Sequence, residues 1–250
     1  MSKRIILITG ASGGIGSALA RAYARTGVTL LLWGRDAARL EETAAACRAK
    51  GAVCQTDSFD LRDVDGLIRR LAAADAATPI DIAIFNAGLG GTAPDGAAAE
   101  TPDASRAVAE VNFVAPVTGA NAIADAMAKR GHGQIVLIGS IAESFPLPMA
   151  PTYAATKAGL RMFAEALGIR LAKTGVGVTL VSPGFIDTAM SRQVTEPKPF
   201  LLSADRAAGI IIRGIEARAR TIVLPWQFAV IRAFTSLLPR ALLRAVLSRA

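Results

Sequence analysis

Two residues that could move a proton stand four positions apart in the stretch TYAATKA, residues 152–158, and the serine Ser140 lies thirteen positions before the tyrosine. If this stretch is helical, Tyr153 and Lys157 project from the same face, because four residues make about one turn. A cation beside a phenol favours the phenolate and lowers a pKa that is ordinarily about 10. A tyrosine in that setting can donate and accept a proton near neutral pH. A surface tyrosine and lysine on an amphipathic helix would look the same, so the rest of the chain must decide.

The elements that would position this pair are seven apolar runs that alternate with alanine-rich stretches. The runs are residues 4–9, 28–33, 52–57, 80–86, 133–139, 176–182 and 220–225. Their near-continuous apolar character is typical of strands buried on both faces. Helices are expected at residues 14–26, 36–50, 63–77, 103–130, 152–174 and 205–218. This alternation predicts an α/β protein of the Rossmann type, a doubly wound parallel seven-stranded sheet with helices on both faces. Ligands of such a sheet bind beyond the carboxyl ends of its strands.

The composition supports one catalytic domain. The chain has 250 residues, 52% of them hydrophobic and 19% charged, which suits a large α/β domain with a buried core. We assign residues 1–225 to that domain, with a substrate loop at about 186–204, and residues 226–250 to an apolar, basic, helical extension.

Several other classes of protein are disfavoured. One histidine, His132, and two cysteines, Cys47 and Cys54, leave little material for a metal site or a histidine-based triad. The cysteines are expected to be reduced thiols. The first residues do not form a secretory signal, and no apolar stretch reaches about 18 residues. We therefore expect a cytoplasmic protein, with peripheral contact at the inner face of the membrane as an alternative.

The glycine-rich turn TGASGGIG, Thr9 to Gly16, lies between the first strand and the first helix. Its glycines permit a tight turn and let a pyrophosphate approach the backbone, where the helix N-terminus attracts it. The spacing is GxxxGxG rather than the GxGxxG of the ordinary dinucleotide fingerprint. We assign five residues of this turn to cofactor binding: Gly10, Ser12, Gly14, Ile15 and Gly16.

The second strand ends in Gly34 and is followed by Arg35. An acidic residue at this place usually holds a free ribose 2′-hydroxyl, whereas a 2′-phosphate needs a cation. A guanidinium can bind a phosphate through two hydrogen bonds. Arg35 therefore favours NADP over NAD, unless it is only a solvent-facing arginine near a helix start. Asp36 could tether it or cap the next helix.

Polar or glycine-rich residues also follow the other strands, where the fold places ligands. Asp57 and the pair Asp60–Leu61 follow the third strand, and Asp60 could accept from the adenine amino group or cap the next helix. The remaining residues of this kind are Asn86, Ala87 and Gly88 after the fourth strand, Ser140 after the fifth, and Pro183, Gly184, Ile186 and Thr188 after the sixth.

Taken together, these residues make the sequence resemble a short-chain dehydrogenase/reductase. TGASGGIG matches the family's TGxxxGxG, Asn86-Ala87-Gly88 its NAG, and Tyr153 to Lys157 its YxxxK. The resemblance covers about residues 4 to 190 and reverses the interpretation of the opening stretch in favour of catalysis. It also includes Ser140 at its usual distance, Asn112 in EVNF, and PGFIDT with its threonine, Thr188.

The resemblance implies a role for each catalytic residue. Tyr153 would be the general acid in carbonyl reduction and the general base in alcohol oxidation. Lys157 would hold the nicotinamide ribose and stabilise phenolate character. Ser140 would hydrogen-bond the substrate oxygen, and Asn112 would hold a water that links Lys157 to solvent. Some NADP-preferring members carry a basic residue where this chain has Gly13, so NADP selectivity would rest mostly on Arg35, with Ser12.

Three loops should select the substrate: about residues 89–100, 141–151 and 186–204. Apolar residues in two of them favour a hydrophobic ketone or aldehyde over a sugar, unless they pack beneath the loops. They are Phe145, Leu147, Pro148, Met149, Met190, Phe200 and Leu201.

The extension and the net charge of +8 suggest partners. The extension could lie on anionic lipid with Trp226 and Phe228 as anchors, or form a subunit interface. We favour contact with another subunit, in a homodimer or homotetramer, or packing on the core. Nucleic acid is not expected, because no basic patch is interleaved with aromatic residues. Two rival functions remain: a non-catalytic NADP-binding regulator, and an epimerase or dehydratase on the related extended scaffold, which generally needs a longer C-terminal part.

Overall fold

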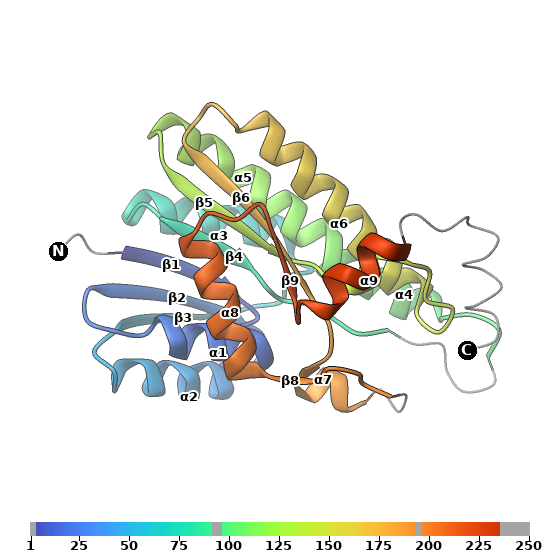
Figure 1. Ribbon diagram of the computed structural model, residues 1–250. Coiled ribbons are helices and arrows are strands. Elements are labelled where there is room, and N and C mark those ends of the chain that lie inside the picture. Colours follow the sequence, from blue (N-terminus) through green and yellow to red (C-terminus); the bar gives the residue numbers. More distant parts are fainter. Residues whose placement is uncertain (1–3, 92–96, 194–196, 236–250) are drawn as a thin grey trace.

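A seven-stranded, fully parallel sheet forms the centre of the molecule (Figure 1), as the sequence predicted. The computed structural model describes residues 4–91, 97–193 and 197–235. The strand order is β3-β2-β1-β4-β5-β6-β9, which is the doubly wound arrangement. The strands are β1 (Arg4–Thr9), β2 (Val28–Gly34), β3 (Val53–Ser58), β4 (Ile82–Phe85), β5 (Gly133–Ile138), β6 (Val176–Pro183) and β9 (Thr221–Leu224).

Helices cover both faces of the sheet, as predicted. The helices α1 (Gly14–Tyr23), α2 (Ala37–Arg48) and α8 (Ala204–Glu216) pack on one face. The helices α3 (Val64–Ala77), α5 (Ala115–Lys129) and α6 (Pro151–Arg170) pack on the other. In β1, Ile6 and Ile8 face the first layer while Ile5 and Leu7 face the second, which is the period-two alternation of a strand buried on both faces.

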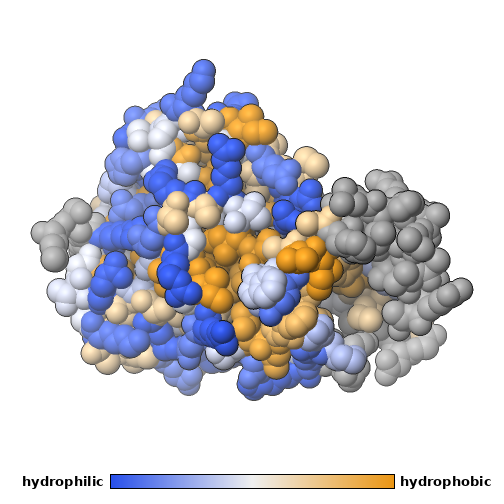
Figure 2. Space-filling model, in the orientation of Figure 1, coloured by the Kyte–Doolittle hydropathy of each residue, from blue (hydrophilic) through white to orange (hydrophobic). Residues whose placement is uncertain are grey.

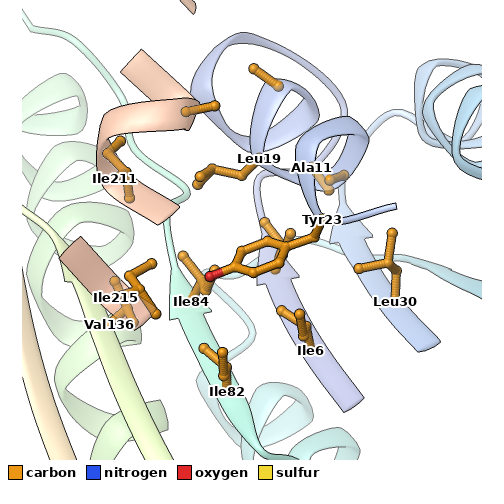
Figure 3. Close-up of a cluster of buried hydrophobic side chains, with 14 of the residues drawn as sticks. Ile6, Ala11, Leu19, Tyr23, Leu30, Ile82, Ile84, Val136, Ile211 and Ile215 are labelled. Atoms are coloured by element: carbon orange, nitrogen blue, oxygen red, sulfur yellow. The ribbon is translucent and has the colours of Figure 1, made fainter. Parts of the chain in front are cut away.

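The centre of the first layer is the ring of Tyr23, which lies among Ile6, Ile82 and Ile84 of the sheet (Figure 3). The side chain is fully buried, and its hydroxyl has no hydrogen-bonding partner among the described residues. Burial raises the pKa of this phenol, so it stays protonated in the folded protein.

The helix expected at 103–130 is built from three pieces. It runs from α4 (Pro102–Ala109) through a π-helical turn, η1 (Glu110–Val114), into α5, and the amide of Ala115 reaches the carbonyl of Glu110 five residues back. Such π turns often occur at functional sites, and this one carries Asn112. By length and composition the run Pro102–Lys129 could cross a membrane, but half of its most apolar window is buried in the fold, as in a helix that covers a sheet.

The segment after β6 is more ordered than the predicted loop. A second, two-stranded parallel sheet pairs β7 (Ile186–Asp187) with β8 (Leu202–Ser203), and a short helix α7 (Ala189–Arg192) follows β7. After β9 the chain continues as α9 (Gln227–Thr235). Residues 227–235 of the predicted extension are helical, its separation from the catalytic domain stays a prediction, and residues 236–250 lie outside the described residues.

Candidate active site

The glycine-rich turn is held against the end of β4 by hydrogen bonds. The hydroxyl of Thr9 accepts from the amides of Asn86 and Ala87, at 3.0 and 3.2 Å, and the Asn86 side chain donates to the Thr9 carbonyl at 3.0 Å. Gly10 has φ +67°, and a Cβ there would lie 2.8 Å from the Cα of Ala87. Glycine is therefore required at this position, both for the left-handed backbone and for the close approach.

The same turn fits a dinucleotide pyrophosphate. Helix α1 begins at Gly14 with no side-chain cap and no acidic residue in its first turn, so its first amide groups are left for a ligand. A Cβ on Gly14 would approach the methyl group of Thr188 to 3.2 Å, so the loop after β6 closes over this turn. Pro183 ends β6, Gly184 follows it, and the buried Ile186 starts β7. The structure thus brings the predicted residues of both loops together.

Tyr153 and Lys157 lie on α6 as the spacing predicted. The ammonium nitrogen of Lys157 is 5.6 Å from the centroid of the Tyr153 ring and donates to the carbonyl of Ile138, at the end of β5, at 2.9 Å. Lys157 is 4% exposed, and burial lowers its pKa to about 8. The pair therefore sits at the carboxyl end of the sheet, beside the strand that leads into Ser140.

The expected effect of Lys157 on Tyr153 is not found. Burial raises the pKa of Tyr153 above its ordinary value, and a nearby carboxylate, Glu143, raises it further, while a hydrogen bond with Ser140 lowers it. The prediction of a lowered pKa was wrong because burial, the largest contribution, penalises the phenolate.

Ser140 is placed to share a substrate oxygen with Tyr153. It is the N-cap of a short 3₁₀ helix, η2 (Ile141–Ser144), and its hydroxyl accepts from the amide of Ala142 at 3.1 Å. Ser140 also lies close enough to Tyr153 to lower the pKa of its phenol. Two hydroxyls from different elements therefore converge at one point.

Asn112 is buried in the π turn η1 and is bound to the loop after β4. Its side-chain amide donates to the carbonyl of Leu89 at 2.8 Å and its side-chain oxygen accepts from the Leu89 amide at 2.7 Å. A Cβ on Gly88 would lie 3.4 Å from the Asn112 oxygen and 3.8 Å from the Lys157 nitrogen. Asn112 and Lys157 thus meet at Gly88, and the water-holding role of Asn112 stays a prediction.

At the adenosine end, the structure shows which aspartates cap helices. Asp36 caps α2 by accepting from the amide of Arg39, as one alternative held. Asp60 does not cap α3, because Asp63 does; Asp60 instead binds the guanidinium and amide of Arg62 at 2.6–2.9 Å. Both Arg62 and Arg35 help to lower the pKa of Asp60, which places Arg35 near it, and Leu61 is buried beside them.

Sequence reasoning missed Arg39. Its guanidinium lies over Gly13, where an added Cβ would overlap its Nη2 atom. This is the very place where the resemblance led us to look for a basic residue and to find none. An open cleft of about 280 Å³ is lined there by Ser12, Gly13, Gly14, Ser17, Arg21, Arg39, Glu42, Thr43 and Ala46. The available signal was the Asp36 cap, which starts α2 so that Arg39 lies in its first turn.

The substrate side is formed by loops that contact one another. A Cβ on Gly90 would lie 3.4 Å from Met190, which joins the loop after β4 to the one after β6. Phe200 has φ +58° and packs edge-to-face on Phe228 of α9 at a ring distance of 5.7 Å. Phe228 is therefore buried under the substrate loop and is not a lipid anchor, whereas Trp226 is 70% exposed.

Known proteins of similar sequence identify the family of this chain. The family model for short chain dehydrogenases matches residues 4–199. A curated relative from Myxococcus xanthus, an uncharacterized oxidoreductase, is 32% identical over 100% of this chain and 98% of its own.

Two solved structures are similar over nearly the whole chain. A short-chain dehydrogenase from Sphingobium yanoikuyae in complex with NADPH has a TM-score of 0.82 and 27% identity, over 95% of this chain and 97% of its own. A bulky-bulky ketone specific alcohol dehydrogenase from Comamonas testosteroni has a TM-score of 0.79 and 26% identity, over 96% and 97%. The chain belongs to the short-chain dehydrogenase/reductase family and is an oxidoreductase enzyme.

Proposed function

We propose that the protein is an NADP(H)-dependent oxidoreductase that interconverts a hydrophobic ketone or aldehyde and its alcohol. The observation that carries this proposal is the convergence of the Ser140 and Tyr153 hydroxyls, beside the buried Lys157, at the end of the sheet where the glycine-rich turn lies. A bound nicotinamide would supply or accept the hydride.

The side chains of this site would handle the proton and the charge. Tyr153 holds a proton at the substrate oxygen and returns it when the alcohol is oxidised. Ser140 donates to the same oxygen, where negative charge develops during reduction. Lys157 keeps a positive charge near that oxygen and would also reach the nicotinamide ribose. Asn112, bound to Leu89, holds the loop that lies over Lys157.

Two guanidiniums support the preference for NADP over NAD. Arg35 and Arg39 are exposed at the end of β2 and the start of α2, and in the described part of the chain neither side chain is ion-paired with a carboxylate. Arg39 covers Gly13 beside Ser12, and Arg35 directly follows Gly34, where an added Cβ would lie 3.3 Å from the Ser12 hydroxyl. Paired cations with free donors suit a 2′-phosphate, which accepts charge-assisted hydrogen bonds.

Nucleotide titration tests this preference. Removing one charge-assisted contact costs about 1.5–3 kcal/mol, so Arg35→Met and Arg39→Met should each weaken NADPH binding by roughly 10- to 150-fold. NADH binding should change little in either variant. Nicotinamide fluorescence measures both dissociation constants. Arg48→Met, on the same helix and paired with Glu41, is the control and should change neither. Equal loss of NADH and NADPH affinity would show that the arginines do not read the 2′-phosphate.

The apolar loops support a hydrophobic substrate. Met149, Met190, Phe200 and Leu201 are all at least 40% exposed, so they do not pack wholly beneath the loops. A similar protein, from Comamonas testosteroni, is named for bulky ketones. We expect reduction of aromatic and other bulky ketones, followed by NADPH absorbance, to exceed that of sugars.

Tyr153→Phe tests whether the site is catalytic. General acid catalysis contributes typically about 10²- to 10⁴-fold, so this variant should bind NADPH normally and lose turnover on that scale. The matched control is Tyr23→Phe, which changes the chain's other tyrosine, far from the strand ends in the core. Near-normal turnover by Tyr153→Phe would refute the assignment. Nucleotide binding with no turnover in the wild type would favour the non-catalytic regulator.

We also propose a cytoplasmic homodimer or homotetramer. Hydrophobic residues gather on the face where α9 and β8 lie (Figure 2); Val230 is exposed on α9 and Trp226 is exposed in the turn before it. Exposed apolar patches of this kind mark interaction surfaces. Light scattering, which measures the molar mass in solution, should show an oligomer for the wild type and a smaller average mass for Trp226→Ser. A monomer that binds anionic liposomes would favour membrane contact instead.

A further inference from the structure

Helix α9 contacts three segments of the active site. Its Arg232 forms an ion pair with Glu143 of η2, the element that Ser140 caps. Its Phe228 packs against Gly184, where an added Cβ would overlap the ring, and against Phe200 of the substrate loop. The C-terminal helix is therefore joined to the serine segment, the loop after β6 and the substrate loop.

Glu143 is a buried carboxylate that none of the roles above uses. Its side chain is 0% exposed, and one oxygen, Oε1, accepts from the Ser182 hydroxyl at 2.7 Å and from Arg232 at 3.2 Å. The other oxygen, Oε2, has no hydrogen-bonding partner among the described residues and lies 2.8 Å from where a Cβ on Gly139 would be. The carboxylate thus fills the space behind Gly139, directly before Ser140.

The charges around Glu143 come from several elements. Burial raises the pKa of Glu143, and Ser182, Arg232 of α9, the backbone of Ser140 and Arg161 of α6 partly offset this by stabilising the ionised form. Its negative charge in turn acts on Tyr153 and Lys157 and favours the protonated form of each. The charge of this one carboxylate therefore raises the pKa of both proton-handling groups.

We propose that Glu143 and Arg232 form a positioning pair: through Arg232, α9 holds the carboxylate that supports the Ser140 segment and balances the charge beside Tyr153 and Lys157. On this proposal the C-terminal helix is a working part of the active site. The proposal rests on the assignment of Tyr153 to proton transfer, but it predicts a property of the free protein that needs no substrate.

The composition of the chain allows a direct test. It has two tyrosines, and burial keeps Tyr23 protonated, so tyrosinate absorbance in the near ultraviolet reports Tyr153 as pH is raised. A Tyr153→Phe sample supplies the blank. The variants are Glu143→Gln, Arg232→Met, Arg232→Lys and the double variant Glu143→Gln/Arg232→Met, each first checked for folding by circular dichroism. Glutamine keeps the shape of Glu143 and can still accept from Ser182.

The expected shifts have opposite signs. Glu143→Gln removes a negative charge and should lower the pKa of Tyr153, and Arg232→Met removes the balancing charge and should raise it, each by roughly 0.5 to 1 unit. Arg232→Lys keeps the charge and should stay near the wild type, as should the double variant, in which both charges are gone. An unchanged or lowered pKa in Arg232→Met overturns the proposal, as does an unchanged pKa in Glu143→Gln.

Turnover gives a second readout. In alcohol oxidation, kcat/KM should rise with pH as Tyr153 loses its proton, and the pH at which it rises should shift in the same direction as the Tyr153 titration in each variant. The control Arg48→Met breaks an exposed arginine–glutamate pair and should move neither the titration nor the profile. Loss of stability without a shift in either pH dependence would show a merely structural pair and would overturn the proposal. If only the proposed function fails, the variants should still show the expected shifts in the Tyr153 titration, but the wild type should turn over no ketone.

Discussion

Replacing Lys157 by methionine should stabilise the protein at neutral pH in the absence of nucleotide. Burial lowers the pKa of this lysine from its ordinary value of 10.5 to about 8. Between those two values the unfolded chain binds a proton that the folded protein does not, so stability rises with pH across that window. Below about pH 8 the lysine is charged in both states, and the full cost of burying the charge is present.

The size of this cost follows from the same two values. At about 1.4 kcal/mol per pKa unit, it is on the order of 3 kcal/mol. Methionine keeps most of the side-chain volume and carries no charge, but it loses the hydrogen bond to the Ile138 carbonyl, which contributes about 1 kcal/mol. We therefore expect Lys157→Met to be more stable than the wild type by about 2 kcal/mol at pH 7, and less stable by about 1 kcal/mol above pH 10.5.

Urea unfolding at several values of pH measures the difference. Other groups titrate in the same range, so the quantity to compare is the free energy of unfolding of Lys157→Met minus that of the wild type. Lys173→Met, at an exposed position, is the matched control and should show no such crossing. A variant that is less stable than the wild type at pH 7, or a difference that does not change with pH, would refute the account of Lys157 as a buried, destabilising charge.

Three further substitutions test the turn, helix α6 and the core. Gly16→Ala should destabilise the fold by about 2 kcal/mol or more and abolish nucleotide binding, because its Cβ would overlap the Gly10 carbonyl and approach the Asn86 amide to 2.5 Å. Gly168→Ala, where the Cβ has room, should instead stabilise α6 by about 0.5–1 kcal/mol. Equal changes in the melting temperatures of the two variants would contradict this. Tyr23→Phe removes a buried hydroxyl with no partner among the described residues, so its free energy of unfolding should equal or exceed that of the wild type by up to about 1 kcal/mol; a clear loss in urea titration would reveal a hydrogen bond to the hydroxyl, such as one to an ordered water.

The sequence was sufficient for features that depend on local pattern and on strand order. The apolar runs predicted the strands of the main sheet, because strands buried on both faces are apolar throughout. The exception is β3, an edge strand that was expected to be buried on both faces and is largely exposed. Placing Gly10, Asn86 and Ser140 at one end of that sheet then followed from its parallel arrangement. The Tyr153–Lys157 spacing likewise gave their common face on α6.

The features that sequence reasoning missed depend on contacts between distant segments. Arg39 fills the place of a side chain on Gly13, which is 26 positions away and on a different element. The pair Glu143–Arg232 joins residues 89 positions apart. The π turn that carries Asn112 has no residue pattern of its own, and the β7–β8 pair is only two residues long on each side.

The wrong prediction for Tyr153 shows what these distant contacts decide. Spacing alone places a cation near the phenol, but the direction of its pKa depends on burial and on every charge nearby. Lys157 and Arg232 carry positive charges, Glu143 carries a buried negative one, and Arg161 of α6 also acts on Glu143. On the proposal above, Arg232 offsets the negative charge of Glu143 beside the site, which leaves the charge of Lys157 to favour the negative charge that develops on a substrate oxygen. The C-terminal helix, which looked from sequence like an appendage, then supplies the offsetting charge.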